Sequence, residues 1–149
     1  MPASTSRRAL SDRFPPSPSC TCDVCVAYCA RPGWWSVEQA EAALDALGAR
    51  MMLELSPDRH FGVLAPAFHG CEGSLATSVG ALSGCTFLVD RRCELFGGVH
   101  VPLECRFCHH ERRHLGSVCH AALVHDWSRP AGQALVGRWH NLMRVLGRW

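Results

Sequence analysis

The sequence predicts a small α+β domain that bound metal ions stabilise. Ten of its 149 residues are cysteines, and eight of them fall into two groups. The first group comprises Cys20, Cys22, Cys25 and Cys29, and the second comprises Cys85, Cys93, Cys105 and Cys108. Thiolates two residues apart can bind one soft metal ion together, whereas disulfide frameworks need no such spacing. Between and after these groups, helical and strand-like patterns predict three to four helices and short hairpins.

Three segments are expected along the chain. Residues 1–19 are rich in Ser, Pro and Arg, cannot supply a core, and are predicted to form a disordered tail. The cysteine-rich metal-binding domain is predicted over residues 20–127. Residues 128–149 are expected to form an amphipathic helix that packs on this domain, through Leu135, Trp139, Leu142, Met143 and Leu146. The arginines of this helix also suit a protein partner or a membrane surface.

Local signals place two further helices. Ser36 and Gln39 have the spacing of a capping box, and Gly48 supplies a C-terminal stop. Between them, apolar residues recur at helical spacing, at Val37, Ala40, Leu44 and Leu47. Farther on, Ser117 is expected to cap a short helix that carries Cys119 in its first turn and ends before Pro130.

Two hairpins are predicted between these helices. Residues 49–55 and 61–65 are short, apolar and strand-like, and a turn sequence joins them. Residues 85–88 and 93–96 form the second pair, around a turn at 90–92. The second hairpin matters for chemistry, because it carries one cysteine near each of its two ends.

The spacing of the cysteines indicates how they bind a metal. Cys22 and Cys25 form a compact clamp, and Cys29 follows one helical turn later. Pro102 is expected to begin a helix on which Cys105 and Cys108 share one face. Cys85 and Cys93 are brought together by the second hairpin. We expect these seven cysteines and Cys119 to be the metal ligands.

The metal is expected to be Zn²⁺, and an iron–sulfur cluster is the alternative, since close thiolates hold either. A disulfide framework also stays open, because the cysteine count is even. Histidines crowd the second cysteine group and add potential ligands, although a solvated polar face is the simpler explanation for His109, His110, His114, His120 and His125. Outside that region, His69 is the best placed.

Composition excludes several classes of protein. No apolar run approaches the roughly 20 residues of a membrane span, and no export signal is recognised, so we expect a cytoplasmic protein in which the cysteines stay reduced. The formal charge is +2. Thiolate ligands around divalent ions would make the loaded protein more acidic, so a nucleic-acid partner is not expected. Nucleotide-binding and hydrolase motifs are absent, and no carboxylate pair stands out.

The first cysteine group resembles a family of zinc- or iron-chelating proteins built on a Cys-x-x-Cys-x-x-Cys-Cys motif, whose members are often labelled iron–sulfur proteins. Cys22, Cys25 and Cys29 match the first, second and fourth cysteines of this motif, and Tyr28 stands at the third. The helix after Ser36 is similar to the helix that follows the motif in the family.

The resemblance spans about residues 20–125. The segment from Cys85 to Phe107 is similar to the family's next block, in which Pro102, Cys105 and Arg106 fit and Val101 replaces an arginine. Cys119 resembles the final family cysteine. This resemblance implies metal binding, in a bacterial structural or carrier module; the alternative is an iron–sulfur enzyme or an accessory of one.

Arg106 is the residue expected to assist the metal without binding it. It follows Cys105 directly, so its guanidinium can donate hydrogen bonds to metal-bound sulfurs and offset their negative charge. A surface ion pair to Glu104 or Glu111 is the alternative role.

Overall fold

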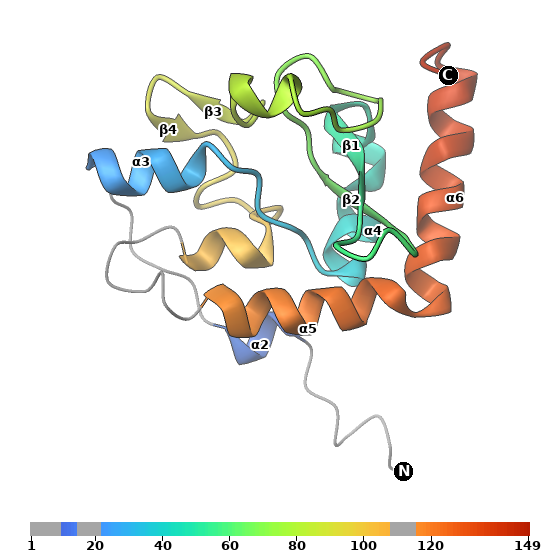
Figure 1. Ribbon diagram of the computed structural model, residues 1–149, viewed down its shortest axis with the longest axis horizontal. Coiled ribbons are helices and arrows are strands. Elements are labelled where there is room, and N and C mark those ends of the chain that lie inside the picture. The colour runs from blue at the N-terminus through green and yellow to red at the C-terminus, as the bar shows by residue number, and fades with distance from the viewer. Residues whose placement is uncertain (1–9, 15–21, 108–115) are drawn as a thin grey trace.

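The computed structural model describes residues 10–14, 22–107 and 116–149 (Figure 1). Its helices are α2 (Leu10–Arg13), α3 (Asp23–Cys29), α4 (Val37–Leu47), α5 (Gly116–Ser128) and α6 (Pro130–Val145), with 3-10 helices η1 (Gly48–Arg50), η2 (Gly80–Ser83) and η3 (Leu103–Phe107). Its strands are β1 (Met51–Leu55), β2 (Gly62–Pro66), β3 (Leu88–Val89) and β4 (Arg92–Cys93). The predicted α+β class, with short hairpins, is confirmed.

Helix α4 begins as the sequence predicts. The Ser36 side chain accepts a hydrogen bond from the Gln39 backbone N–H, and the Gln39 side chain accepts one from the Ser36 backbone N–H. These two bonds satisfy amides that the helix itself leaves without partners. Val37, Ala40 and Leu44 are then buried on one face.

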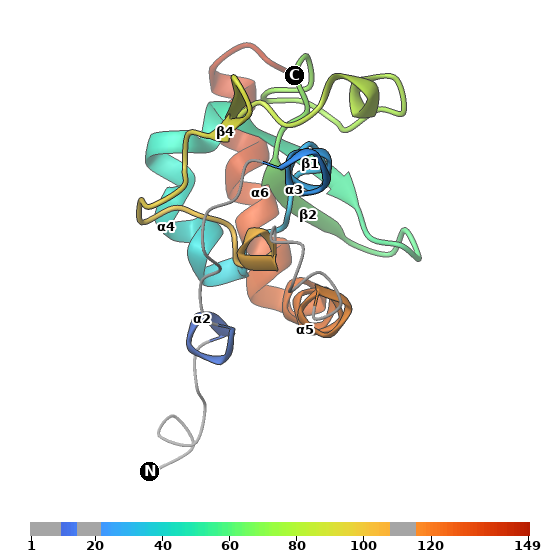
Figure 2. The ribbon, with the colours of Figure 1, turned by 90° about the vertical axis from the view of Figure 1, so that its left-hand side faces the viewer.

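The β1–β2 hairpin is antiparallel, with Met51 opposite Pro66 and Leu55 opposite Gly62. Strand β2 is buried along its whole length. Helix α6 packs on β2, and α4 packs on α6 (Figure 2). Gln133 of α6 is joined to β2 by two hydrogen bonds with the Gly62 backbone, of 2.9 and 3.1 Å.

The second hairpin is shorter than predicted, with Leu88 opposite Cys93 and Val89 opposite Arg92. Asp90 and Arg91 form its turn with positive φ, at 50° and 67°. Asp23 at the start of α3 forms an ion pair of 2.8 Å with Arg91, so α3 lies beside this hairpin (Figure 1).

The predicted C-terminal helix exists as α6 and supplies part of the core. Leu135, Trp139 and Met143 are buried, and the Trp139 indole donates to the Gly48 carbonyl at 2.8 Å. The stripe is shorter than expected, because Leu146 is 53% exposed. No described helix has both the length and the apolar character needed to cross a bilayer.

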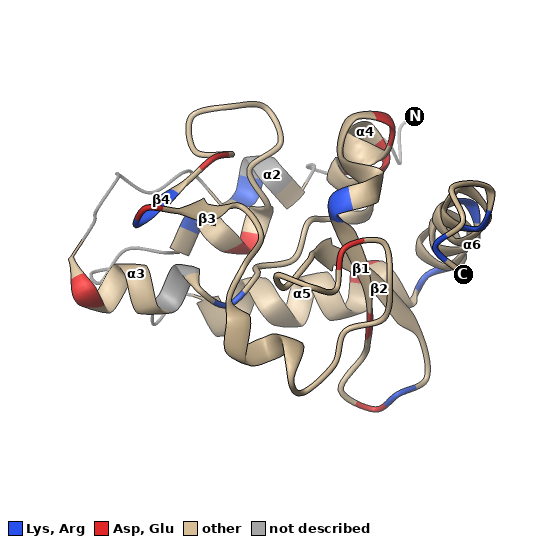
Figure 3. Cartoon of the chain, turned by 90° about the horizontal axis from the view of Figure 1, so that it is seen from above, with Lys and Arg blue, Asp and Glu red and all other residues tan. Residues whose placement is uncertain are grey.

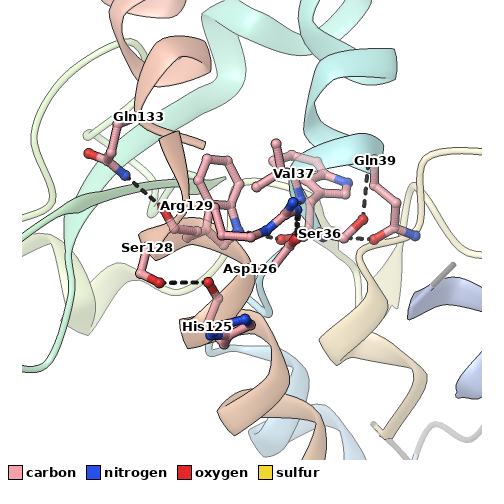
Figure 4. Close-up of polar contacts among 10 residues, drawn as sticks. Ser36, Val37, Gln39, His125, Asp126, Ser128, Arg129 and Gln133 are labelled. Atoms are coloured by element: carbon pink, nitrogen blue, oxygen red, sulfur yellow. Dashed lines mark hydrogen bonds and ion pairs between the residues drawn. The ribbon is translucent and has the colours of Figure 1, made fainter. Parts of the chain in front are cut away.

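A buried polar network joins the start of α4 to the end of α5 (Figure 4). Asp126 accepts a hydrogen bond of 2.8 Å from the Val37 amide and forms an ion pair with Arg129. Beside it, the Trp127 indole donates to the Trp35 carbonyl at 2.8 Å. The bonds from Val37 to Asp126 and from Trp127 to Trp35 each join segments about 90 positions apart, so the network fixes how the two helices meet.

Three further details differ from the predictions. Within the expected tail, residues 10–13 form α2, and the ring of Phe14, which follows α2, packs edge-on against Phe107 with 5.7 Å between centroids. The other tail residues lie outside the described part. Helix α5 begins at Gly116, so Ser117 lies inside it and is not the cap. The segment after Pro102 is a 3-10 helix rather than an α-helix.

The charged residues are spread over the described chain (Figure 3). Arginines lie on α2, β4, η1 and α6. The arginines of the described residues are therefore not confined to one element.

Candidate metal centre

The second cysteine group and Cys119 come from three separate elements. Cys85 lies buried just before β3, and Cys93 is half-buried in β4. Cys105 is half-buried in η3, and Cys119 is fully buried in the first turn of α5. Cys85, Cys105 and Cys119 carry free thiols.

Cys105 is the central member of this set, which we call the Cys105 cluster: Cys85, Cys93, Cys105 and Cys119. Burial is the largest cause of the raised pKa values of Cys85 and Cys119; the charges of Cys105 and Cys93 add to the shift of Cys85, and the charge of Cys105 adds to that of Cys119. Because a charge acts on a pKa only over a limited distance, these side chains lie in one region of the fold. The hairpin, η3 and α5 therefore bring predicted ligands into the same region.

Burial controls the protonation of these thiols. It is the largest cause that raises the pKa of Cys85 to about 12, ahead of the neighbouring thiols. Burial likewise raises the pKa of Cys119 to about 12; Glu104 and Cys105 add to the shift, and Arg106 opposes it. Without a bound metal ion, both sulfurs are therefore protonated at neutral pH. A bound metal ion would take the place of these protons.

Arg106 lies half-buried beside the Cys105 cluster. Its Nη1 donates a hydrogen bond of 2.6 Å to the Phe14 carbonyl, and its charge lowers the pKa of Cys119. The guanidinium thus contributes positive potential where thiolates would gather and also holds α2 to η3. Its predicted hydrogen bond to a metal-bound sulfur stays a prediction, and the alternative partner Glu111 lies outside the described residues.

The first cysteine group lies on and beside α3. Cys22 is exposed immediately before the helix, and Cys25 is fully buried within it. Cys29 is the last residue of α3, and its side chain lies outside the described part, as do Cys20 and Cys108. The ion pair between Asp23 and Arg91 brings α3 to the hairpin that carries Cys93.

Cys71 stands apart from both groups. It is buried in the 70–84 loop, with its Sγ 3.7 Å from Oγ1 of Thr77. Of the histidines named above, His69 and His125 are exposed, His120 bonds to a carboxylate, and His109, His110 and His114 lie outside the described residues.

The donor set of the Cys105 cluster fits a soft metal, because four sulfur ligands suit Zn²⁺ and iron–sulfur clusters alike. Within residues 10–14, 22–107 and 116–149, no three His, Cys, Asp or Glu side chains already stand at positions that hold a metal ion. Closing the Cys105 cluster around an ion would therefore need these segments to shift, or ligands from outside those ranges.

A second group of polar residues lies next to Cys105 and was not anticipated. Glu54 of β1 and Glu104 of η3 both bind Trp34: Glu54 accepts from its indole at 3.1 Å, and Glu104 from its backbone N–H at 2.9 Å. Nδ1 of His120 is 2.6 Å from the other oxygen of Glu104. These carboxylates are 50 residues apart in the sequence, so no local pattern could reveal the pair.

The comparisons with known proteins add no relative: no family model, no curated protein and no solved structure matches this chain.

Proposed function

We propose that this chain binds a metal ion through the Cys105 cluster, with Zn²⁺ as the favoured metal. The observation that carries the proposal is the convergence of Cys85, Cys93, Cys105 and Cys119 from a hairpin, a 3-10 helix and an α-helix. Four thiolates complete a tetrahedral zinc site.

Energetics support a structural role for the metal. The β3–β4 hairpin pairs only two residues on each strand, and η3 is a single 3-10 helix. Such short elements are marginal by themselves, and a metal that joins them contributes its binding energy to folding. Under this proposal the protein is a structural or carrier module that acts in the cytoplasm, where thiols stay reduced.

Metal analysis of purified protein tests the proposal. We expect protein purified anaerobically from its native host to contain stoichiometric zinc and to be colourless. Cys105→Ser should remove most of the metal, because it takes away the central ligand. Cys71→Ser is the control: Cys71 is likewise a cysteine with a free thiol, although it is more buried than Cys105, and it lies outside the Cys105 cluster, so the metal content should not change.

Two outcomes would change the conclusion. Brown protein with absorbance near 400 nm would assign an iron–sulfur cluster to the same cysteines and favour the enzyme or accessory alternative. Equal metal content in Cys105→Ser, Cys71→Ser and the wild-type protein would show that the Cys105 cluster is not the site.

A further inference from the structure

A pocket of about 360 Å³ opens beside the Cys105 cluster, between the 31–34 segment, β1, η3 and the start of α5. Charged side chains of both signs line it, together with an aromatic ring: Arg31, Trp34, Glu54, Glu104 and His120. Gly116 and Ser117, the first residues of α5, complete the wall. The metal proposal uses none of these side chains.

One side of the pocket is negative. Glu54 is half-buried, and it accepts a hydrogen bond from the neutral indole of Trp34. Burial raises the pKa of Glu54, and the charge of Glu104 raises it further, whereas the bond from Trp34 and the charges of His120 and Arg31 lower it. A ligand cation next to Glu54 would replace solvation that the carboxylate has lost.

Groups with positive charge or potential also line the pocket. Arg31, which is exposed, and Gly116 and Ser117 of α5 are among its lining residues. The first-turn amides of an α-helix have no acceptor within the helix, and the helix dipole adds positive potential there. A guanidinium next to these amides suits a carboxylate, which accepts hydrogen bonds from both.

We infer that this pocket binds a free α-amino acid as a zwitterion. The ammonium group would lie by Glu54 and Trp34, and the carboxylate by Arg31 and the first turn of α5. The size agrees, since about 360 Å³ is near the lower end of the range of small-molecule pockets, roughly 300–1,000 Å³. The aromatic face of Trp34 adds a favourable contact for an organic cation.

A peptide terminus fits less well, because it carries only one of the two charges. A simple organic cation carries no group that could pair with Arg31. A simple carboxylate would lie near two side chains of its own charge, Glu54 and Glu104. The inference is independent of the metal proposal, since Glu54 and Arg31 are not among the proposed metal ligands.

Calorimetric titration of the purified protein with each of the twenty L-amino acids tests the inference. We expect at least one to bind, and its decarboxylated amine and its 2-hydroxy acid to bind at least about tenfold more weakly, because each lacks one charged group. The same amino acid should shift the indole N–H resonance of Trp34, which the Trp34→Phe variant identifies, because that N–H donates to Glu54.

Variants locate the binding. Glu54→Gln keeps an acceptor for the Trp34 indole but removes the charge, and Arg31→Gln removes the guanidinium; each should weaken binding by about tenfold. Glu41→Gln and Arg138→Gln are the matched controls, because these residues form an exposed ion pair between α4 and α6 and do not line the pocket; their affinity should equal that of the wild-type protein. Metal content, measured on every variant, should stay unchanged.

Three results would overturn the inference: no amino acid binds up to about 10 mM; the matching amine or 2-hydroxy acid binds as tightly as the amino acid; or Glu54→Gln and Arg31→Gln bind like the controls. None of these would affect the metal proposal, whose test is the metal content of the Cys105→Ser variant.

Discussion

Gly33→Ala tests whether the 31–34 segment and η3 are held as closely as the structure shows. A Cβ atom on Gly33 would lie 2.8 Å from the Cys105 Sγ and 2.9 Å from the Cys105 backbone nitrogen. The thiol can rotate away, but the nitrogen belongs to η3 and donates to the Pro102 carbonyl at 3.0 Å. To reach an ordinary contact of 3.4 Å, η3 would have to move by about 0.5 Å.

The cost can be worked from the bonds next to this contact. Two hydrogen bonds join the segments: Glu104 N–H to the Trp34 carbonyl at 3.2 Å, and Trp34 N–H to the Glu104 carboxylate at 2.9 Å. A shift of that size would weaken both, and each contributes about 1 kcal/mol. We therefore expect Gly33→Ala to lower the free energy of unfolding by about 2 kcal/mol, within the usual range for overpacking.

Urea unfolding measures this difference, with Gly137→Ala as the matched control. Gly137 is exposed in α6, and a Cβ there meets nothing within 4 Å. The control should raise stability by up to about 1 kcal/mol, because alanine favours a helix more than glycine does. Equal unfolding midpoints for Gly33→Ala and the wild-type protein would refute the close packing of Gly33 on η3.

Three further expectations concern the rest of the molecule. Asp126→Ala should cost about 2 kcal/mol in urea unfolding, because the buried Val37 amide loses its acceptor, whereas Arg129→Ala should cost less than about 1 kcal/mol; equal losses would contradict this ranking. Burial raises the pKa of Glu54 in the folded protein above its value in the unfolded chain. As the pH rises from the unfolded value through the folded one, the ionised carboxylate therefore lowers the free energy of unfolding. Glu54→Gln should therefore have a higher melting temperature than the wild-type protein at pH 7, with the difference smaller below about pH 4, and a difference that is constant with pH would be inconsistent with this cause. Complete metal removal by a chelator should unfold the protein, as followed by circular dichroism; an unchanged spectrum and melting curve would remove the structural role of the metal.

Elements with strong local signals were predicted well. Helix α4 could be read from the sequence because Ser36 and Gln39 satisfy each other's amides within four residues. The two hairpins and α6 follow from apolar runs and turn residues, which act over short distances. The errors have two causes. At Ser117 the local signal for a helix cap is weak, and the residue lies inside α5. At Phe14 a contact with the distant Phe107 orders a segment whose own composition predicts a disordered tail.

The candidate metal site was predictable only in part. Spacing pointed to Cys105, the predicted hairpin implied that Cys85 and Cys93 approach each other, and Cys119 was expected from the family resemblance. That Cys105 lies between the hairpin and α5 depends on how three elements pack, which spacing does not specify.

The sequence by itself determined the α+β class, the boundaries of α4 and the two hairpins, because each depends on residues that are close in the chain. Only the tertiary structure decided that Glu54, Glu104 and His120 meet around Trp34, and that Asp126 holds the start of α4. The physical reason is that these polar contacts join segments up to 89 residues apart. Their geometry is set by the packing of the whole core, to which every buried side chain contributes.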